Sequence, residues 1–254
     1  MNFSGNQVVV TGGANGIGRC IAETFLSAGA QVVIIDTDKK AGQSLQSHFS
    51  QLRFYRADIA EKDALDAFVG TLSYPVDILV NNACVGRAGL LSGCTWEDFE
   101  YVQRVSVTAP YYLTSLLLQR NLLAPGASIV NIASTRAFQS QPDTESYSAA
   151  KGGIAALTHA MAVSFAGRAR VNCISPGWID TAQYHEGATL PEHNTPDKAQ
   201  HPAGRVGNPE DIASMALYLC GGHASFITGE NIAVDGGMSK LMIYHGDSGW
   251  EFNA

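Results

Sequence analysis

The sequence is poor in charged residues and has no cluster of positive charge. Charged side chains make up 15% of its 254 residues, against about 25% in an average soluble domain. This low fraction predicts that much of the surface is buried in a core or between subunits. The formal net charge is −7, and no block of lysine or arginine offsets it. The balance argues against a surface that binds nucleic acid or an anionic membrane.

The chain also lacks cysteine pairs and long apolar runs. Its five cysteines are scattered and form no C-x-x-C pair, which fits a reduced, cytoplasmic compartment better than a disulfide framework. No apolar run approaches the roughly 20 residues that a membrane helix needs. The N-terminus has no basic segment followed by an apolar stretch. We therefore expect neither a membrane span nor a signal peptide.

Strand-like and helix-like patterns alternate along the chain. The predicted strands are residues 8–10, 32–35, 52–57, 77–80, 128–133, 171–175 and 232–234. Stretches of helical length separate them, and the first has apolar residues at Ile17, Ile21 and Phe25. This alternation predicts an α/β fold, in which one doubly wound parallel sheet of seven strands has helices on both faces. With no linker or internal repeat, we expect a single domain of residues 1–254.

Two segments interrupt this alternation. Residues 181–204 are polar and contain proline, and they are long enough to form a substrate loop. Residues 240–254 continue past the last predicted strand and include Met242, Trp250 and Phe252. Exposed apolar side chains of this kind usually mark a contact surface, so we expect the extension to dock, with a neighbouring subunit as one candidate.

A glycine-rich turn follows the first predicted strand. Gly12, Gly16 and Gly18 lie where that strand passes into the first helix. Their spacing differs from G-x-G-x-x-G, but the physical requirements are similar: a tight turn, close approach to a pyrophosphate, and free N–H groups at the helix N-terminus. The alternative is an ordinary strand-to-helix turn. The flanking strand and helix favour dinucleotide binding.

An acidic residue ends the second predicted strand. Asp36 stands eighteen residues after Gly18, where a carboxylate can accept hydrogen bonds from ribose hydroxyls and repel a 2′-phosphate. Thr37 follows it, and Asn15 adds no positive charge to the turn. NAD is therefore favoured over NADP. The alternative is that Asp36 only caps a helix or a turn.

A tyrosine and a lysine are spaced to share one face of a helix. Tyr147 and Lys151 are four residues apart, and Ser134 precedes Tyr147 by thirteen residues. An ammonium about 4 Å from a phenol interacts with the phenolate by about 4 kcal/mol at an effective dielectric of roughly 20. That interaction would lower the pKa of the tyrosine by two or three units. A lone Tyr-x-x-x-Lys pair is weak evidence and gains weight from the motifs around it.

These residues together resemble the short-chain dehydrogenase/reductase family, which has a Rossmann-like fold, over nearly the whole chain. The matching motifs, in family order, are residues 11–18, the pair Asp58 and Ile59, the run Asn81, Asn82 and Ala83, the residues Ser134, Tyr147 and Lys151, and residues 176–181, 227–230 and 234–237. Any one of them alone would be weak evidence. Their shared order is strong evidence.

The resemblance implies a role for each matching residue. Tyr147 is the expected general acid and base, Lys151 lowers its pKa and binds the nicotinamide ribose, and Ser134 orients the substrate oxygen. Asn81 is expected to brace the sheet through backbone bonds. The implied contacts of the NAD cofactor are Gly12, Asn15, Gly16, Ile17, Gly18, Asp36, Asp58, Ile59, Asn82, Ala83, Tyr147, Lys151, Pro176, Gly177, Ile179 and Thr181.

The sequence departs from the family pattern at two positions. Ser106 stands where the family carries a catalytic asparagine. A serine cannot reproduce both amide hydrogen bonds, so a proton relay through water to Lys151 would be weaker or rerouted, and we expect reduced turnover. Cys84 stands where the family carries glycine. It either crowds the nicotinamide ribose or is a tolerated small residue.

Other polar and aromatic residues of these loops leave alternatives open. His185, His193 and His201 recur every eight residues, but metal ligands are usually closer in sequence and come from fixed elements, so we expect no metal site. Arg136 either meets an anionic group of the substrate, or faces solvent or has a structural role. Three aromatic residues either line an apolar substrate wall or pack in the core, namely Phe138, Trp178 and Tyr184.

The sequence therefore predicts an oxidoreductase that transfers a hydride between NAD(H) and a secondary alcohol or ketone. Two alternatives remain: a 3-oxoacyl reductase, which Asp36 and the acidic charge oppose, and a nucleotide-binding sensor or scaffold, which Ser106 favours. The apolar helical regions 105–118 and 149–165 are wider than one core face needs. Because the family pairs these helices between subunits, we expect a homotetramer or a dimer.

Overall fold

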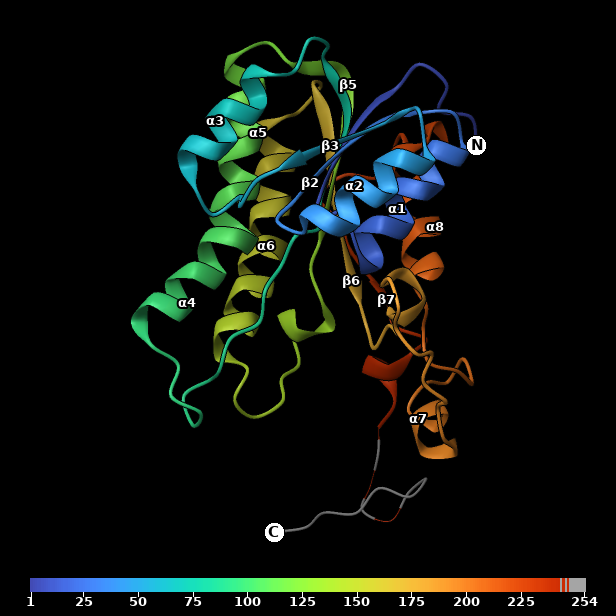
Figure 1. Ribbon diagram of the computed structural model, residues 1–254. Coiled ribbons are helices and arrows are strands. Elements are labelled where there is room, and N and C mark those ends of the chain that lie inside the picture. Colours follow the sequence, from blue (N-terminus) through green and yellow to red (C-terminus); the bar gives the residue numbers. More distant parts are fainter. Residues whose placement is uncertain (243, 245, 247–254) are drawn as a thin grey trace.

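A seven-stranded parallel sheet forms the centre of the computed structural model, which describes residues 1–242, 244 and 246 (Figure 1). The strand order is β3-β2-β1-β4-β5-β6-β7, and every neighbouring pair is parallel. The strands are β1 (Gln7–Thr11), β2 (Gln31–Asp36), β3 (Leu52–Arg56), β4 (Val76–Asn81), β5 (Leu123–Ile132), β6 (Ala169–Pro176) and β7 (Asn231–Val234). The predicted fold class and the seven predicted strands are confirmed.

Helices cover both faces of the sheet (Figure 1). One face packs against α1 (Gly16–Ser27), α2 (Lys39–His48) and α8 (Pro209–Cys220). The other face packs against α3 (Lys62–Gly70), α5 (Ala109–Gln119) and α6 (Glu145–Ser164). The remaining helices are α4 (Trp96–Gln103), α7 (Thr195–Ala199) and the short η1 (Arg104–Thr108), η2 (Thr135–Ala137), η3 (Ala182–Tyr184), η4 (Gly222–Ala224) and η5 (Met238–Lys240).

The central strands are apolar because both of their faces are buried. Side chains alternate across a strand, so Val8 and Val10 join the core under α1, while Val9 joins the core under α3 and α5. Ile34 and Ile35 divide between the two cores in the same way. This arrangement explains why the strands read as continuous β-branched runs.

One strand is longer than the sequence pattern suggests. We expected this strand to begin at residue 128, and the preceding Pro125 and Gly126 are residues that disfavour the interior of a strand. β5 instead begins at Leu123, which pairs with Val76 before an irregularity in the ladder. The pairing with β4 extends the strand through residues that disfavour it locally.

Helix α8 begins with a capping box. Asn208 and Asp211 form a reciprocal capping box, with a proline at the first helical turn. Thr95 caps α4 by accepting the Asp98 N–H at 3.1 Å, and its own hydroxyl donates to the Asp98 carboxylate.

Among the described residues, no helix combines the length and apolarity needed to span a bilayer.

Of the two segments that interrupt the alternation, residues 181–204 lie between β6 and α8, and residues 240–254 follow β7. The segment 181–204 contains η3 and α7, and it continues from the end of β6 (Figure 1). A second capping box, formed by Asn194 and Asp197, starts α7. The expected docking of residues 240–254 concerns a segment that lies mostly outside the described residues.

A buried chain of hydrogen bonds links two strands to α6. Asn81 donates to the Asn131 side chain at 2.8 Å, and Asn131 donates to the Thr158 hydroxyl at 2.8 Å. We expected Asn81 to bond the backbone, whereas its amide bonds a side chain on the neighbouring strand. It still braces the sheet, because the chain joins β4, β5 and α6.

Candidate active site

Three adjoining cavities lie along the edge of the sheet where the parallel strands end. The turn cavity, of about 380 Å³, surrounds the glycine-rich turn. The central cavity, of about 200 Å³, contains Tyr147 and Lys151, and the outer cavity, of about 720 Å³, opens beside Ser134 and Tyr147. They share lining residues, including Asn82 between the first two and Ser134 between the last two. The carboxyl edge of an α/β sheet is the usual ligand site of such folds.

Most of the expected cofactor residues meet in these cavities. The turn cavity is lined by Gly12, Asn15, Gly16, Ile17, Asp36, Asp58, Ile59, Asn82, Ala83 and Thr181. The central cavity adds Tyr147, Lys151, Pro176, Gly177 and Ile179. Gly18 and Ser106 line neither of these cavities.

The glycines of the turn lie in conformations and spaces that exclude other residues. Gly12 and Gly16 have φ of 64° and 57°, which favour glycine. A Cβ at Gly18 would stand 2.1 Å from the Gly12 carbonyl oxygen. Asn82 holds the same turn by donating to the Thr11 and Gly12 carbonyls at 3.1 and 2.9 Å. Gly18 thus serves close packing of the turn.

The Asp36 carboxylate braces the turn and still faces the cavity. One of its oxygens accepts the Ala14 N–H and the other accepts the Asp38 N–H, both at 3.0 Å. Each carboxylate oxygen has a further lone pair, so capacity remains for ribose hydroxyls. Asn15 donates to Asp38 at 3.0 Å. The Ala41 N–H and then Asn15 hold the pKa of Asp38 below its usual value, so the turn keeps a second carboxylate charged.

Several lining residues of the turn cavity were missed at the level of sequence. Tyr101 donates to the Asp58 carboxylate at 2.8 Å, and burial, followed by Asp58, raises the pKa of this phenol. Its position on α4 carries no sequence signal that links it to Asp58. The other missed residues are Ile35, Thr37, Ala57, Val85, Val105 and His185.

Helix α6 brings the phenol and the ammonium together as its spacing predicts. The Lys151 side chain is 2% exposed. Its Nζ lies 5.3 Å from the centre of the Tyr147 ring and donates to the Ile132 carbonyl at 2.8 Å. Anchored at the end of β5, the ammonium stays beside the phenol.

Ser134 is oriented by the short helix that follows it. Its Oγ accepts the Arg136 backbone N–H at 3.1 Å. The bond occupies one lone pair and leaves the hydroxyl hydrogen free to donate. Ser134 and Tyr147 line both the central and the outer cavity.

Ser106 lies in a turn of π-helix between α4 and α5. This segment, η1, contacts α6, and Ser106 is 4% exposed with a hydroxyl oxygen that has no hydrogen-bond partner. Single π turns inside helices often occur at functional sites. Cys84, the other departure from the family pattern, is exposed and lines the turn and central cavities.

Of the three aromatic residues considered for a substrate wall, Trp178 lines the outer cavity. Phe138 is 51% exposed and lies outside its lining, and Tyr184 packs near the α1 core while its hydroxyl donates to Glu210 at 2.9 Å. The Trp178 ring meets the His193 ring edge-on and the His201 ring at a tilt of 45°.

The three histidines have separate surroundings. His193 bonds the Asp180 carboxylate at 3.0 Å, His201 bonds the Asp197 carbonyl at 3.1 Å, and His185 lines the turn cavity. Within the part of the chain that the structure describes, no group of three or more His, Cys, Asp or Glu side chains could hold a metal ion.

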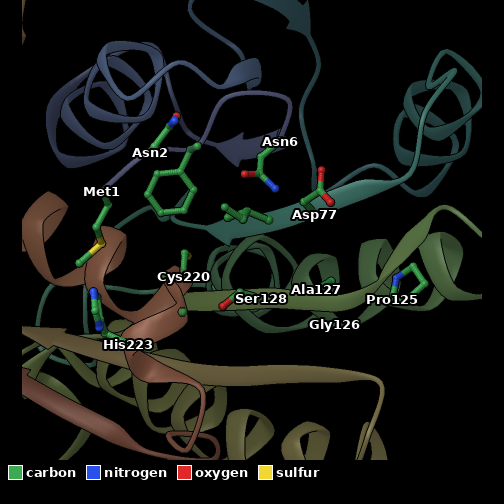
Figure 2. Close-up of a pocket in the computed structure, with 14 residues that line it drawn as sticks. Met1, Asn2, Asn6, Asp77, Pro125, Gly126, Ala127, Ser128, Cys220 and His223 are labelled. Atoms are coloured by element: carbon green, nitrogen blue, oxygen red, sulfur yellow. The ribbon is translucent and has the colours of Figure 1, made fainter.

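A fourth cavity lies at the opposite edge of the sheet, where β1, β4 and β5 begin (Figure 2). Its volume is about 650 Å³, and Asp77, Ser128, Cys220 and His223 are among the residues that surround it. None of the expected site residues lines it.

The strand order and the glycine turn define a Rossmann-like α/β protein, and sequence comparison narrows the class. A family profile described as "Enoyl-(Acyl carrier protein) reductase" matches residues 12–239. An "Uncharacterized oxidoreductase" of Thermotoga maritima is 43% identical over 253 residues, with 95% of this chain and 99% of that protein covered. The 3-oxoacyl-(acyl-carrier-protein) reductase FabG of Chlamydia pneumoniae is 35% identical, with 92% and 97% covered.

Solved structures agree with this class. An apo SCOR enzyme from Clostridium thermocellum gives a TM-score of 0.89 at 46% identity, with 98% of this chain and 99% of that chain covered. BdcA in complex with NADPH gives 0.81 at 27% identity, covering 92% and 94%. A 3-ketoacyl-(acyl-carrier-protein) reductase from Brucella melitensis complexed with NADH gives 0.80 at 30% identity, covering 93% and 99%. The chain belongs to the short-chain dehydrogenase/reductase family of oxidoreductases, as its motifs predict.

Proposed function

We propose that the protein transfers a hydride between NAD(H) and a secondary alcohol or ketone. The observation that supports this most is the division of three side chains between two cavities. Ser134 and Tyr147 line both the central and the outer cavity, whereas Lys151 lines the central one. A substrate oxygen at the boundary would meet both hydroxyls, while the ammonium stays on the cofactor side of the phenol.

Each of these side chains has one task in the proposed reaction. Tyr147 accepts the alcohol proton in oxidation and returns it in reduction. Lys151, fixed by the Ile132 carbonyl, stabilises the negative charge that the phenol oxygen carries without its proton. The free O–H of Ser134 donates to the substrate oxygen and stabilises charge that develops there.

The turn and central cavities suit a nicotinamide dinucleotide. The N-terminus of α1 offers N–H groups to a pyrophosphate beside Gly12, Asn15, Gly16 and Ile17. Asp36, Asp58 and Ile59 would hold the adenosine part, and Asn82, Ala83, Lys151, Pro176, Gly177, Ile179 and Thr181 the nicotinamide part. When bound, the dinucleotide supplies the hydride chemistry.

Two carboxylates support NAD as the cofactor. Asp36 lines the turn cavity and Asp38 lies two residues further on, so a 2′-phosphate there would meet negative charge. NADP is the second candidate. Arg56 reaches the Thr37 carbonyl at 3.5 Å from the end of β3, and similar structures hold NADPH in one case and NADH in another. The dissociation constants of NADH and NADPH, measured by nicotinamide fluorescence, decide between them.

The experiment that tests the reaction is a screen of secondary alcohols with NAD⁺ at alkaline pH, in which NADH formation is followed. We expect turnover by the wild type and a loss of at least about 100-fold in kcat for Tyr147→Phe, with NADH binding retained. Nucleotide binding without turnover on any alcohol or ketone would instead indicate a sensor or scaffold. Turnover of an acetoacetyl thioester with NADPH alone would favour a 3-oxoacyl reductase, which the FabG relatives suggest.

We also propose that the protein is a cytoplasmic homo-oligomer, either a tetramer or a dimer. Helices α4, α5 and α6 expose large apolar side chains, among them Trp96, Tyr111 and Val163, which are 77%, 57% and 78% exposed. Exposed apolar groups on neighbouring helices favour burial against another copy. The cysteines are free, which fits a reducing compartment. Light scattering at several protein concentrations gives the oligomeric state.

A further inference from the structure

The outer cavity has a cationic and polar lining beside the reactive hydroxyls. Two arginines, Arg87 and Arg136, line it together with Ser134 and Tyr147. Thr144, Gln141 and Gln200 add uncharged polar groups, Trp178 and Met238 add apolar surface, and Asp197 is the one acidic residue of the lining. The charges of this cavity therefore bear on which substrate it accepts.

Two of the three charged side chains are already engaged. Arg87 lies 3.3 Å from the Asp98 carboxylate, and its guanidinium stacks 5.0 Å from the centre of the Tyr101 ring. The Asp197 carboxylate accepts the Asn194 N–H at 2.9 Å as part of the box that starts α7. A carboxylate at a helix N-terminus is stabilised where it stands. Neither group needs a substrate partner.

Arg136 has no acidic partner within the described residues. The half-buried guanidinium donates to the Gln141 amide oxygen and, at 3.4 Å, to the Thr144 hydroxyl. Both acceptors are neutral. A guanidinium has five N–H donors in a planar fork that matches carboxylate and phosphate oxygens, so three donors and a full positive charge remain.

Arg136 and Ser134 belong to the same short segment and line the same outer cavity. Arg136 belongs to η2, and its backbone N–H is the donor that orients Ser134. The backbone of Arg136 thus orients Ser134, and its side chain lines the same outer cavity. A substrate whose oxygen meets Ser134 would lie in a cavity that Arg136 also lines.

We propose that Arg136 binds an anionic group of the substrate, a carboxylate or a phosphate ester, so that the enzyme acts on a hydroxy acid or on a phosphorylated alcohol. This inference depends on the proposed function for the site, and it adds the substrate class. Arg87, already paired, sets the background positive charge of the cavity and does not select the substrate.

The test uses matched substrates that differ in charge alone. A 3-hydroxy carboxylate is compared with its methyl ester, and a polyol phosphate with the free polyol, by kcat/KM in wild type, Arg136→Gln, Arg136→Lys and Arg87→Gln. We expect Arg136→Gln to lose about 10- to 100-fold on the preferred anion and less than about threefold on its neutral partner. Arg136→Lys keeps part of the preference, because charge remains without the fork. The matched control Arg87→Gln changes the anion-to-neutral ratio by less than about threefold.

Two results would overturn the proposal. One is a wild type that shows no preference for the anion over its neutral partner, and the other is equal loss on both partners in Arg136→Gln, which indicates a purely structural role in holding η2 to α6. If no alcohol is turned over at all, the proposed function fails separately. Calorimetric titration of malonate and inorganic phosphate into the NADH-loaded protein then decides the Arg136 proposal: binding that Arg136→Gln abolishes supports it, and absent or unchanged binding contradicts it.

Discussion

The two edges of the sheet carry cavities of similar size but of opposite chemistry. The fourth cavity, which lies where the strands begin and is called the amino-edge cavity below, has a volume of about 650 Å³. The outer cavity, at the carboxyl edge where the strands end, has a volume of about 720 Å³, and both are large enough for a small molecule. At the carboxyl edge, the free N–H groups of α1 meet a glycine turn and a buried ammonium. At the amino edge, α8 ends and its orphan carbonyls need donors.

Three carbonyls of the last turn of α8 have donors from within the fold: the Gly221 N–H donates to the Leu217 and Tyr218 carbonyls, and Arg170 donates to the Leu219 carbonyl at 2.6 Å. Arg170 also reaches two carbonyls beyond α8, those of Ile227 and Gly221, at 3.4 and 3.5 Å. One carboxylate oxygen of Asp77 accepts the Gln7 N–H at 2.7 Å. Cavity volume alone therefore does not identify a site; the carboxyl edge stands out because a helix N-terminus and a buried cation remain available to a ligand.

The largest difference between the two edges is expected when one glycine of each edge is replaced by alanine. In Gly18→Ala the added Cβ meets the Gly12 carbonyl at 2.1 Å, so the turn must shift, at a cost of about 1–3 kcal/mol. We expect NADH affinity to fall at least about tenfold. The control is Gly222→Ala at the amino edge, where a Cβ meets nothing within 4 Å. Denaturant unfolding and NADH titration give both numbers, and wild-type binding by Gly18→Ala would contradict the role of the turn.

Two aspartates provide the next comparison, because each braces β1 or its turn through a backbone N–H. Asp36 bonds Ala14 at the carboxyl edge, and Asp77 bonds Gln7 at the amino edge. We expect Asp36→Asn to lower the preference for NADH over NADPH about tenfold, since the charge that repels a 2′-phosphate is lost. Asp77→Asn should cost about 1 kcal/mol of stability and leave the preference intact. An unchanged ratio in Asp36→Asn would remove the argument for NAD.

The relay position gives a smaller effect. Ser106→Asn restores the amide that the family carries beside α6, and we expect kcat to rise about three- to tenfold. The larger side chain costs about 1–3 kcal/mol of packing in this buried place, so rates are compared well below the midpoint of thermal unfolding. Ser106→Ala removes a hydroxyl that has no partner, and it should keep kcat within about twofold. No gain in Ser106→Asn would mean that protons leave Lys151 by another route.

The sequence could predict what depends on local pattern. The strands could be predicted because both faces of the sheet are buried, so that their residues, such as Val9 and Ile35, are apolar. The Tyr147–Lys151 pair could be predicted because helical spacing fixes its geometry. The contact of Tyr101 with Asp58 joins residues 43 apart. It depends on how α4 packs over the sheet, which no local pattern encodes.

The same limit explains the other differences. β5 begins early because its partner β4 is in place, and Asn81 finds the Asn131 side chain because the two strands are neighbours. Arg136 could be named from its distance to Ser134 along the chain, but its lack of an acidic partner emerges only when the loops are folded. Pairing between distant segments decides these features.

The smallest expected effect concerns the reactivity of one cysteine at each edge. Cys220, at the amino edge, should not react with iodoacetamide, whereas the labelling of Cys84, at the carboxyl edge, should depend on ligand binding. Burial raises the pKa of the Cys220 thiol to about 12, so at pH 8.5 roughly one thiol in three thousand is ionised, and only the thiolate reacts. Cys84 is exposed and lines the turn and central cavities. We expect iodoacetamide to label Cys84 and NADH to protect it, while Cys220 remains unlabelled with or without NADH, as peptide mass spectrometry would measure. Because a thiol with a raised pKa gains reactivity only as the pH approaches that value, labelling of Cys220 at pH 8.5 would contradict the raised pKa of this thiol. NADH-dependent protection of Cys220 would go further and place a ligand at the edge that the helix termini disfavour.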